Sequence, residues 1–347
     1  MRHNGDFSGN GSRMEWTRAT AGALGMAVPI ITGVASGHPG EGFAACAGSL
    51  MLGGAASGRS ARHDAREIGE VLAPAIAATL VAALVAGRAF LEPVAIVVLA
   101  ACASLVGSMS RSGATAAVRF VLFLLVAIGV AQNVPERAAA IALIVAGACW
   151  AAAASFVVAL IARAMRRSRD PGHGEENPPP TVLARFAHWR RSLRHLDGWQ
   201  YAMRLTLCLA AAELLDAAWP GHHVRWTAIT VVLLTERRPE AWPRRTFERA
   251  VGTLAGVFIA AFAFAMPPSS WMLAIAMGIL AGMRPLLRNR SYAAYTAITT
   301  PLILAILDGG EAPDIALLLD RLAATLIAAV LVLLANAAFR RAMTSVS

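Results

Sequence analysis

Residues 225–256 read RWTAITVVLLTERRPEAWPRRTFERAVGTLAG: a short apolar run, a turn rich in arginine, and a second apolar run that contains glycine. Such a charged turn between two core helices is unusual in a soluble protein. In a membrane it is typical of a helical hairpin whose turn faces the cytoplasm. The stretch therefore predicts a membrane protein built from helical hairpins.

The composition of the 347 residues agrees with this prediction, since 57% are hydrophobic and only 15% are charged. A soluble domain of this size carries about 25% charged residues. The apolar residues form segments, many of which have the length that crosses a hydrocarbon core of about 30 Å. Twelve segments are predicted: 16–36, 41–58, 70–89, 93–110, 116–133, 138–164, 200–219, 224–236, 247–266, 270–286, 291–307 and 315–339.

These segments predict the fold class, an all-α polytopic membrane protein with about twelve transmembrane helices. Only helices satisfy their own backbone groups in lipid while being joined by connections this short. A transmembrane barrel would show alternating strands of about ten residues, which the sequence lacks.

The distribution of arginine predicts the orientation. All 31 basic residues are Arg, and placing the N-terminus in the cytoplasm puts 27 of them on the cytoplasmic side and 4 outside. Cytoplasmic connections carry such an excess of positive charge. The net charge of +10 is therefore explained by topology in the inner membrane, with both termini cytoplasmic, and nucleic acid is not an expected partner.

The chain divides into two halves of equal design. We expect a cytoplasmic tail at 1–15, a six-helix repeat at 16–164, a linker at 165–198, a second repeat at 199–341 and a tail at 342–347. Four features recur at offsets of 183 to 186 residues: Arg18 and Arg204, Gly37-His38 and Gly221-His222, Arg66 and Arg249, Arg137 and Arg321. Six spans per half predict parallel repeats. Within the linker, LARFAHWRRSLRHL predicts an amphipathic helix on the cytoplasmic leaflet, with a calmodulin-type or nucleic-acid-binding segment as the alternative.

Two carboxylates in the seventh segment are candidates for proton coupling. Glu213 and Asp216 lie three residues apart and so share a helix face near the outer end. Acidic groups inside a span are costly unless they are paired or hydrated. The alternative is an interfacial carboxylate that pairs with Arg225. Asp320 and Arg321 are likewise expected to form an interfacial pair.

Hydroxyl and aromatic side chains are candidates for the wall of a substrate pathway. The short eighth segment and the proline-broken eleventh segment carry most of them, and broken or short segments at matching positions indicate a transporter's site. The candidates are Thr227, Thr230, Tyr292, Tyr295, Thr296, Thr299 and Thr300. The alternative is that they pack between helices. Arg18 and Arg204 either extend to the headgroups or form a basic ring that draws anions into a cytoplasmic mouth.

The sequence indicates neither an enzyme nor a metal or cofactor site. It has no GxSxG, HExxH, Walker A or CxxC motif, and its His residues fall in tails, turns and the linker. The cysteines (Cys46, Cys102, Cys149 and Cys208) lie in apolar segments and are expected to be small buried hydrophobes.

The hairpin of residues 225–256 resembles the signature of the fusaric acid resistance (FUSC) family, which includes aromatic acid exporters and is similar to aluminium-activated malate transporters. The resemblance rests on WTAITVVL and on RRTFERAVGTLAG, whose motif residues are Arg249, Gly252, Thr253 and Gly256. It implies efflux of aromatic acids or, more broadly, permeation of organic anions. The chain departs from the large bacterial exporters in having only a short linker in place of a sizeable soluble domain.

We therefore predict a multi-pass inner-membrane transporter that exports aromatic or other amphipathic organic acids by proton coupling. The alternatives are a passive organic-anion channel or uniporter, and a non-transporting scaffold in envelope biogenesis. The expected partners are the lipid bilayer and a small organic anion, with a homo-oligomer as an alternative to a monomer.

Overall fold

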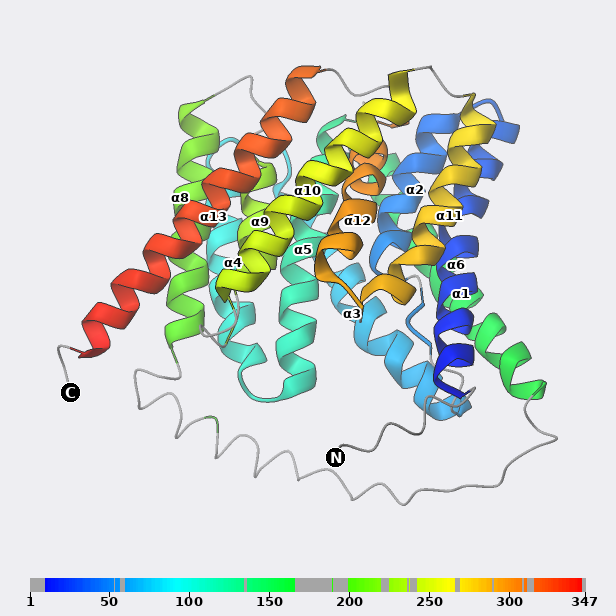
Figure 1. Cartoon of the computed structure of the whole chain (residues 1–347), viewed down its shortest axis with the longest axis horizontal. Coiled ribbons are helices and arrows are strands. Elements are labelled where there is room, and N and C mark those ends of the chain that lie inside the picture. The colour runs from blue at the N-terminus through cyan, green and yellow to red at the C-terminus, as the bar shows by residue number, and fades with distance from the viewer. Residues whose placement is uncertain are drawn as a thin grey trace, which may run out of the picture.

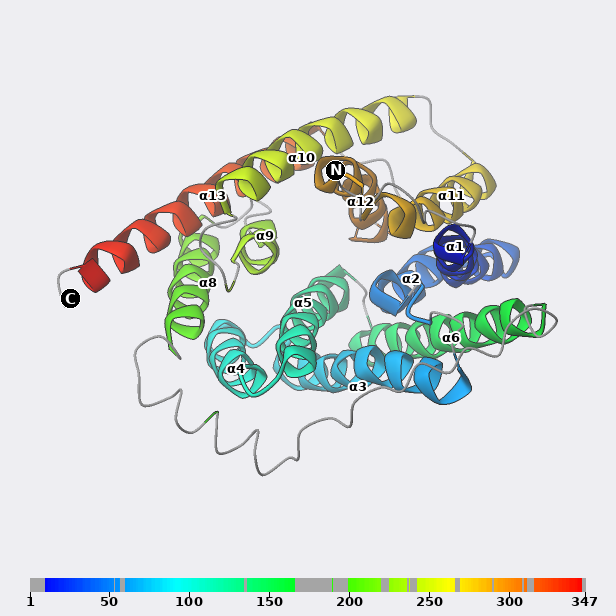
Figure 2. The ribbon, with the colours of Figure 1, turned by 60° about the horizontal axis from the view of Figure 1, so that its bottom comes forward.

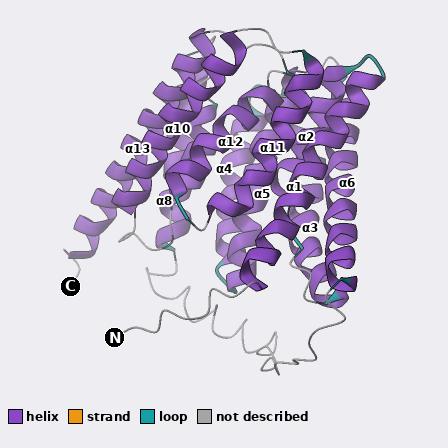
Figure 3. Ribbon diagram, turned by 45° about the vertical axis from the view of Figure 1, so that its right-hand side comes forward, coloured by secondary structure: helices purple, strands orange, loops and turns teal. Residues whose placement is uncertain are grey.

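The computed structural model describes residues 10–52, 54–56, 60–133, 136–165, 189, 199–219, 225–235, 237, 242–265, 269–288, 290–307, 309–310 and 315–344. In these residues the secondary structure consists of helices, as the fold class predicts, and short loops join helices that run alongside one another (Figure 3). Seven of the helices are long and apolar enough to cross a membrane.

Each predicted segment corresponds to one helix. The helices are α1 (Asn10–Ala35), α2 (Pro39–Leu52), α3 (Ala61–Val85), α4 (Leu91–Gly107), α5 (Arg111–Asn133), α6 (Arg137–Ala164), α8 (Gln200–Ala218), α9 (Trp226–Leu234), α10 (Trp242–Ala265), α11 (Ser270–Arg288), α12 (Tyr292–Leu307) and α13 (Ile315–Thr344).

Several helix ends differ from the apolar segments. α3 begins at Ala61 instead of 70, because the side chain of Ser60 caps the helix and Arg66 pairs with Glu70 at 3.0 Å along its polar first turns. α1 and α13 likewise extend into the stretches 1–15 and 342–347 that were expected to be tails. Hydropathy finds the part of a helix that prefers lipid, whereas capping and charge pairs extend the helix beyond it.

The predicted linker at 165–198 lies outside the described residues except for Met165 and Trp189. The indole N–H of Trp189 donates to the carbonyl of Leu105 at 3.0 Å and to Oγ of Ser108 at 2.9 Å. The predicted amphipathic helix therefore stays a prediction, with one side chain of its sequence bound at the end of α4.

The helices pack as two groups, α1–α6 and α8–α13. In the first group α1 contacts α2 and α6, α3 contacts α5 and α6, and α4 contacts α5. In the second group α8 contacts α9 and α13, α10 contacts α12 and α13, and α11 contacts α12. The contacts named here for the first group thus each have a counterpart between helices of the same rank in the second.

Two seams join the groups, one where α1 contacts α11 and one where α4 contacts α8 (Figure 2). α2 also contacts α12, and α5 contacts α9. α1 begins, α6 ends, α8 begins and α13 ends at one end of the bundle, which we call the termini end; the other is the far end (Figure 1). At a rise of about 1.5 Å per residue, α2 is about 21 Å long and α9 only about 14 Å.

Candidate functional site

Two polar clusters lie at opposite ends of the bundle. The arginine–tyrosine cluster, at the termini end, consists of Arg245, Arg249, Arg284, Tyr292 and Tyr295. The carboxylate cluster, at the far end of the α4–α8 seam, consists of Glu92, Gln132, Glu213, Asp216 and Arg225. The first contains two predicted pathway residues and the second contains both predicted proton-coupling residues.

The arginine–tyrosine cluster brings positive charge and aromatic faces together. Arg249 Nη1 donates to the hydroxyl of Tyr292 at 3.3 Å, and Arg284 Nη2 donates to that of Tyr295 at 3.1 Å. The guanidinium groups of Arg245 and Arg284 lie 5.5 and 5.6 Å from the centroids of Tyr292 and Tyr295. The two rings stack with centroids 6.3 Å apart.

This cluster has spare hydrogen-bond donors. The Nε atoms of Arg249 and Arg284 are buried and have no hydrogen-bond partner among the described residues. The neighbouring carboxylate of Glu248 pairs instead with Arg244, at 2.7 Å. Since a buried donor without an acceptor costs free energy, an anionic group at this place would be stabilising.

The glycines of the family motif bring α10 close to α12. A Cβ atom on Gly252 would lie 2.8 Å from Cβ of Thr296, and one on Gly256 would lie 2.6 Å from Cβ of Thr300. Thr296 and Thr300 therefore face α10, which favours the packing alternative for these two predicted pathway residues. The hydroxyls of Thr299 and Thr300 donate to backbone carbonyls one turn earlier, at 2.7 and 2.9 Å.

The predicted pathway residues of α9 meet α13. Thr227 and Thr230 are fully buried, and Oγ1 of Thr230 lies 3.5 Å from Arg321 Nη1. Arg321 is 1% exposed, and its guanidinium lies 4.2 Å from the ring centroid of Trp226. The expectation that Arg321 forms an interfacial pair with Asp320 is thus wrong for the arginine, because adjacent helical residues point in different directions.

Arg18 and Arg204, which the predicted repeat pairs, have different surroundings. Arg18 Nη2 lies 3.7 Å from Oε1 of Glu67, and its side chain is 34% exposed. Arg204 is 3% exposed and donates to the amide oxygen of Asn336. The described contacts therefore tie each arginine to its own group of helices.

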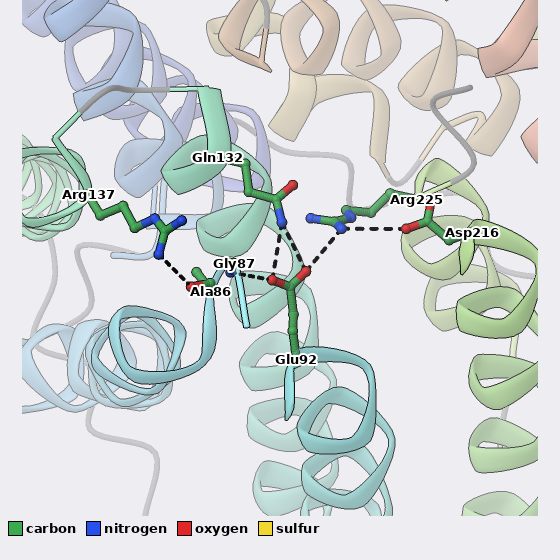
Figure 4. A network of polar contacts seen from close by, with 7 residues as sticks. All are labelled: Ala86, Gly87, Glu92, Gln132, Arg137, Asp216 and Arg225. Atoms are coloured by element: carbon green, nitrogen blue, oxygen red, sulfur yellow. Dashed lines mark hydrogen bonds and ion pairs between the residues drawn. The ribbon is translucent and has the colours of Figure 1, made fainter. Parts of the chain in front are cut away.

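The carboxylate cluster is centred on Glu92, at the start of α4 (Figure 4). Oε2 of Glu92 accepts a hydrogen bond from the Gly87 N–H at 2.6 Å, and Gln132 Nε2 lies 3.0 and 3.1 Å from its two oxygens. Arg225 Nη2 lies 3.0 Å from Oε1 of Glu92 and 3.5 Å from Oδ2 of Asp216. One guanidinium group thus joins a carboxylate of the first group to one of the second.

The cluster opens into a pocket of about 230 Å³. The first group of helices contributes Ala89, Glu92 and Gln132 to its wall, and the second contributes Glu213, Ala217 and Arg225. Glu213 is only 8% exposed. Glu213 and Asp216 thus lie on the same wall of the pocket. Asp216 pairs with Arg225, as in the alternative of an interfacial carboxylate.

Sequence reasoning missed Glu92, Gln132 and Arg284. Glu92 lies just before the predicted segment 93–110, where an acidic residue at the membrane surface is ordinary, and its partner Arg225 lies in the other half of the chain. Arg284 lies near the termini end, where arginine is common. The sequence alone therefore does not distinguish it from the arginines that have no specific contact. The signal available for Glu92 was an acidic residue directly before an apolar segment.

The four cysteines are free. Cys46 and Cys208 are buried as expected, whereas Cys102 and Cys149 are exposed on the bundle surface, because they lie on the outward faces of α4 and α6. Among the described residues, the His, Cys, Asp and Glu side chains form no group of three that could hold a metal ion.

Residues 206–335 match the family model described as fusaric acid resistance protein-like. The match extends from α8 to α13 and contains the hairpin of residues 225–256 on which the sequence resemblance rests. No curated protein and no solved structure matches the chain. The family resemblance is therefore confirmed over residues 206–335, and the seven helices of the described residues that are long and apolar enough to cross a membrane indicate a multi-pass membrane protein.

Proposed function

We propose that the protein is an inner-membrane transporter that exports aromatic or other amphipathic organic acids by proton coupling. In this proposal all twelve helices belong to the membrane domain, as two parallel repeats with both termini cytoplasmic. The matching contacts of α1–α6 and α8–α13 support the repeat. The excess of arginine near the termini end supports the orientation.

The arginine–tyrosine cluster is the observation that carries the proposal. An aromatic carboxylate offers two oxygens to guanidinium N–H groups and a ring to stack on tyrosine. Arg249 and Arg284 supply unpartnered N–H groups, and Tyr292 and Tyr295 supply stacked rings. On the proposed orientation this cluster faces the cytoplasm, where an exporter takes up its substrate.

The carboxylate cluster supports proton coupling at the outer side. Glu213 is buried on the wall of an open pocket, and an isolated carboxylate in a span is costly to hold charged. A proton reaching it from outside would relieve that cost. Glu213 therefore takes the role of the proton acceptor, and Asp216 stays paired with Arg225.

Flux of radiolabelled benzoate into liposomes that contain the purified full chain tests the proposal. An imposed pH gradient is expected to drive accumulation, and Arg284→Gln is expected to reduce the rate about tenfold or more, as loss of a charge-assisted contact predicts. Arg244→Gln is the matched control, because Arg244 is exposed and pairs with Glu248. Charge-carrying flux that ignores the pH gradient would establish the passive channel instead, and absence of flux for a panel of organic acids would favour the scaffold.

A second measurement concerns Glu213. Glu213→Gln keeps the size of the side chain but cannot exchange a proton, so accumulation driven by the pH gradient is expected to be lost while exchange of benzoate for benzoate persists. Asp216→Asn is the control and is expected to keep most of the coupling. Unchanged pH dependence in Glu213→Gln would remove Glu213 from the mechanism.

A further inference from the structure

The α4–α8 seam is tied at both ends by arginines that flank the short helix α9. At the far end Arg225 bridges Glu92, on α4, and Asp216, on α8. At the termini end Arg237 Nη2 lies 3.4 Å from the carbonyl of Ser104, on α4, and its guanidinium lies 4.6 Å from the ring centroid of Tyr201, on α8. Both ends of α9 thus connect the two groups of helices.

The far-end tie has the properties of a contact that can open. Glu92 is held in place by Gly87 and Gln132 of its own group, so its position does not depend on Arg225. Arg225 has a second carboxylate, Asp216, in its own group. When the groups separate, the arginine can therefore keep a charged partner, which lowers the cost of breaking the tie.

The pocket beside this tie shows that the seam is not filled at its far end. Its wall is shared between the groups, and Glu92 and Arg225 are both part of it. Water can therefore reach the ion pair from the pocket and replace it when the groups separate. The α1–α11 seam, by contrast, is closed by small residues in direct contact.

We propose that Glu92 and Arg225 form the outer gate of the transport path. The α4–α8 seam opens at its far end when this ion pair breaks, Arg225 stays with Asp216, and the α1–α11 seam remains closed as the hinge. The substrate leaves through the widened pocket. This inference rests on the proposed transport function.

The test measures the opening of the seam independently of flux. The full chain, with Cys46, Cys102, Cys149 and Cys208 replaced by Ala or Ser, receives Pro93→Cys, a half-buried position in the pocket wall, and is reacted in vesicles with a membrane-impermeant maleimide. Glu92→Gln removes the bond between the groups and is expected to raise the labelling rate about tenfold, as loss of a charge-assisted contact predicts. Asp216→Asn takes away the partner that Arg225 keeps when the groups separate, so it is expected to lower the labelling rate or leave it unchanged, and not to raise it.

Two further variants serve as a replacement for Glu92→Gln and as a negative control. Arg225→Gln is expected to raise labelling as Glu92→Gln does, and it replaces that variant if Glu92→Gln does not fold. Ala27→Cys, in the α1–α11 seam, is expected to stay unlabelled in every background. Equal labelling in the Glu92→Gln and Asp216→Asn backgrounds, or labelling at Ala27→Cys, would overturn the gate. If labelling follows the expected pattern but the protein shows no flux, the seam opens as proposed and the transport function is wrong. If the protein shows flux but labelling does not change between variants, transport is supported and the gate is wrong.

Discussion

The α1–α11 and α4–α8 seams join the same two groups of helices by different means. At the first, a Cβ atom on Gly278 would lie 2.9 Å from Cβ of Ala27, and one on Gly282 would lie 3.1 Å from the carbonyl of Ala19. At the second, the groups meet through Arg225, Glu92 and a pocket. Close contact of small residues depends on an unbroken fit, whereas an ion pair beside water can exchange partners. The same pair of surfaces can therefore be fixed at one edge and separable at the other.

The largest effect is expected from breaking the closed seam. Gly278→Leu forces a branched side chain against α1, and overpacking of this kind costs about 1–3 kcal/mol or more. We expect a large loss of monodisperse protein in detergent and a lower Tm. Gly69→Ala is the matched control, because a Cβ there meets no atom within 4 Å. A Gly278→Leu protein as stable as this control would show that the α1–α11 seam is not tightly packed.

The second effect concerns the separable seam. Glu92→Ala leaves the Gly87 N–H and the Gln132 amide without their acceptor and removes one partner of Arg225. Such losses cost about 1.5–3 kcal/mol. Glu70→Ala, which removes an exposed pair with Arg66, is expected to cost at most about 0.5 kcal/mol. Thermal unfolding of the two variants side by side measures the difference, and equal Tm values would contradict the buried tie.

The smallest effect is expected at the other end of the same seam. Arg237 meets a backbone carbonyl and a tyrosine ring, and an exposed cation–π contact is worth about 0.5–1 kcal/mol. Arg237→Gln is therefore expected to lower Tm by less than Glu92→Ala does. The exposed Arg62→Gln is the control. A larger fall in Tm for Arg237→Gln than for Glu92→Ala would show that the contact at the termini end of the seam is the stronger of the two.

Hydropathy predicted the helices well because membrane helices and buried helices both need long apolar runs. It missed helix ends such as Ala61, where Ser60 and the Arg66–Glu70 pair continue the helix in polar sequence. It also placed Arg321 at an interface, although the guanidinium lies buried over Trp226. Local periodicity carries no information on which distant ring or hydroxyl a side chain meets.

The candidate site was predictable only in part. Tyr292, Tyr295, Glu213 and Asp216 were identified because hydroxyl, aromatic and acidic groups are rare in apolar segments. Their arginine partners also hold residues far along the chain: Arg284, which bonds Tyr295, donates to the carbonyl of Leu50, 234 residues away, and Arg225, which pairs with Asp216, reaches Glu92 in the other half. A single sequence does not encode such pairs in any local pattern.

The length of α13 has a consequence for the membrane itself. Its apolar stretch, Ile315–Arg341, has 27 residues, or about 40 Å at 1.5 Å per residue, against a hydrocarbon core of about 30 Å. The helix runs obliquely across the bundle (Figure 1), which is how a long helix fits a thinner bilayer. Because Arg321 on α13 holds Trp226 and Thr230 of α9, a change in bilayer thickness that alters this tilt also displaces α9. Since Arg225 directly precedes α9, the length of the lipid acyl chains would then affect the position of Arg225.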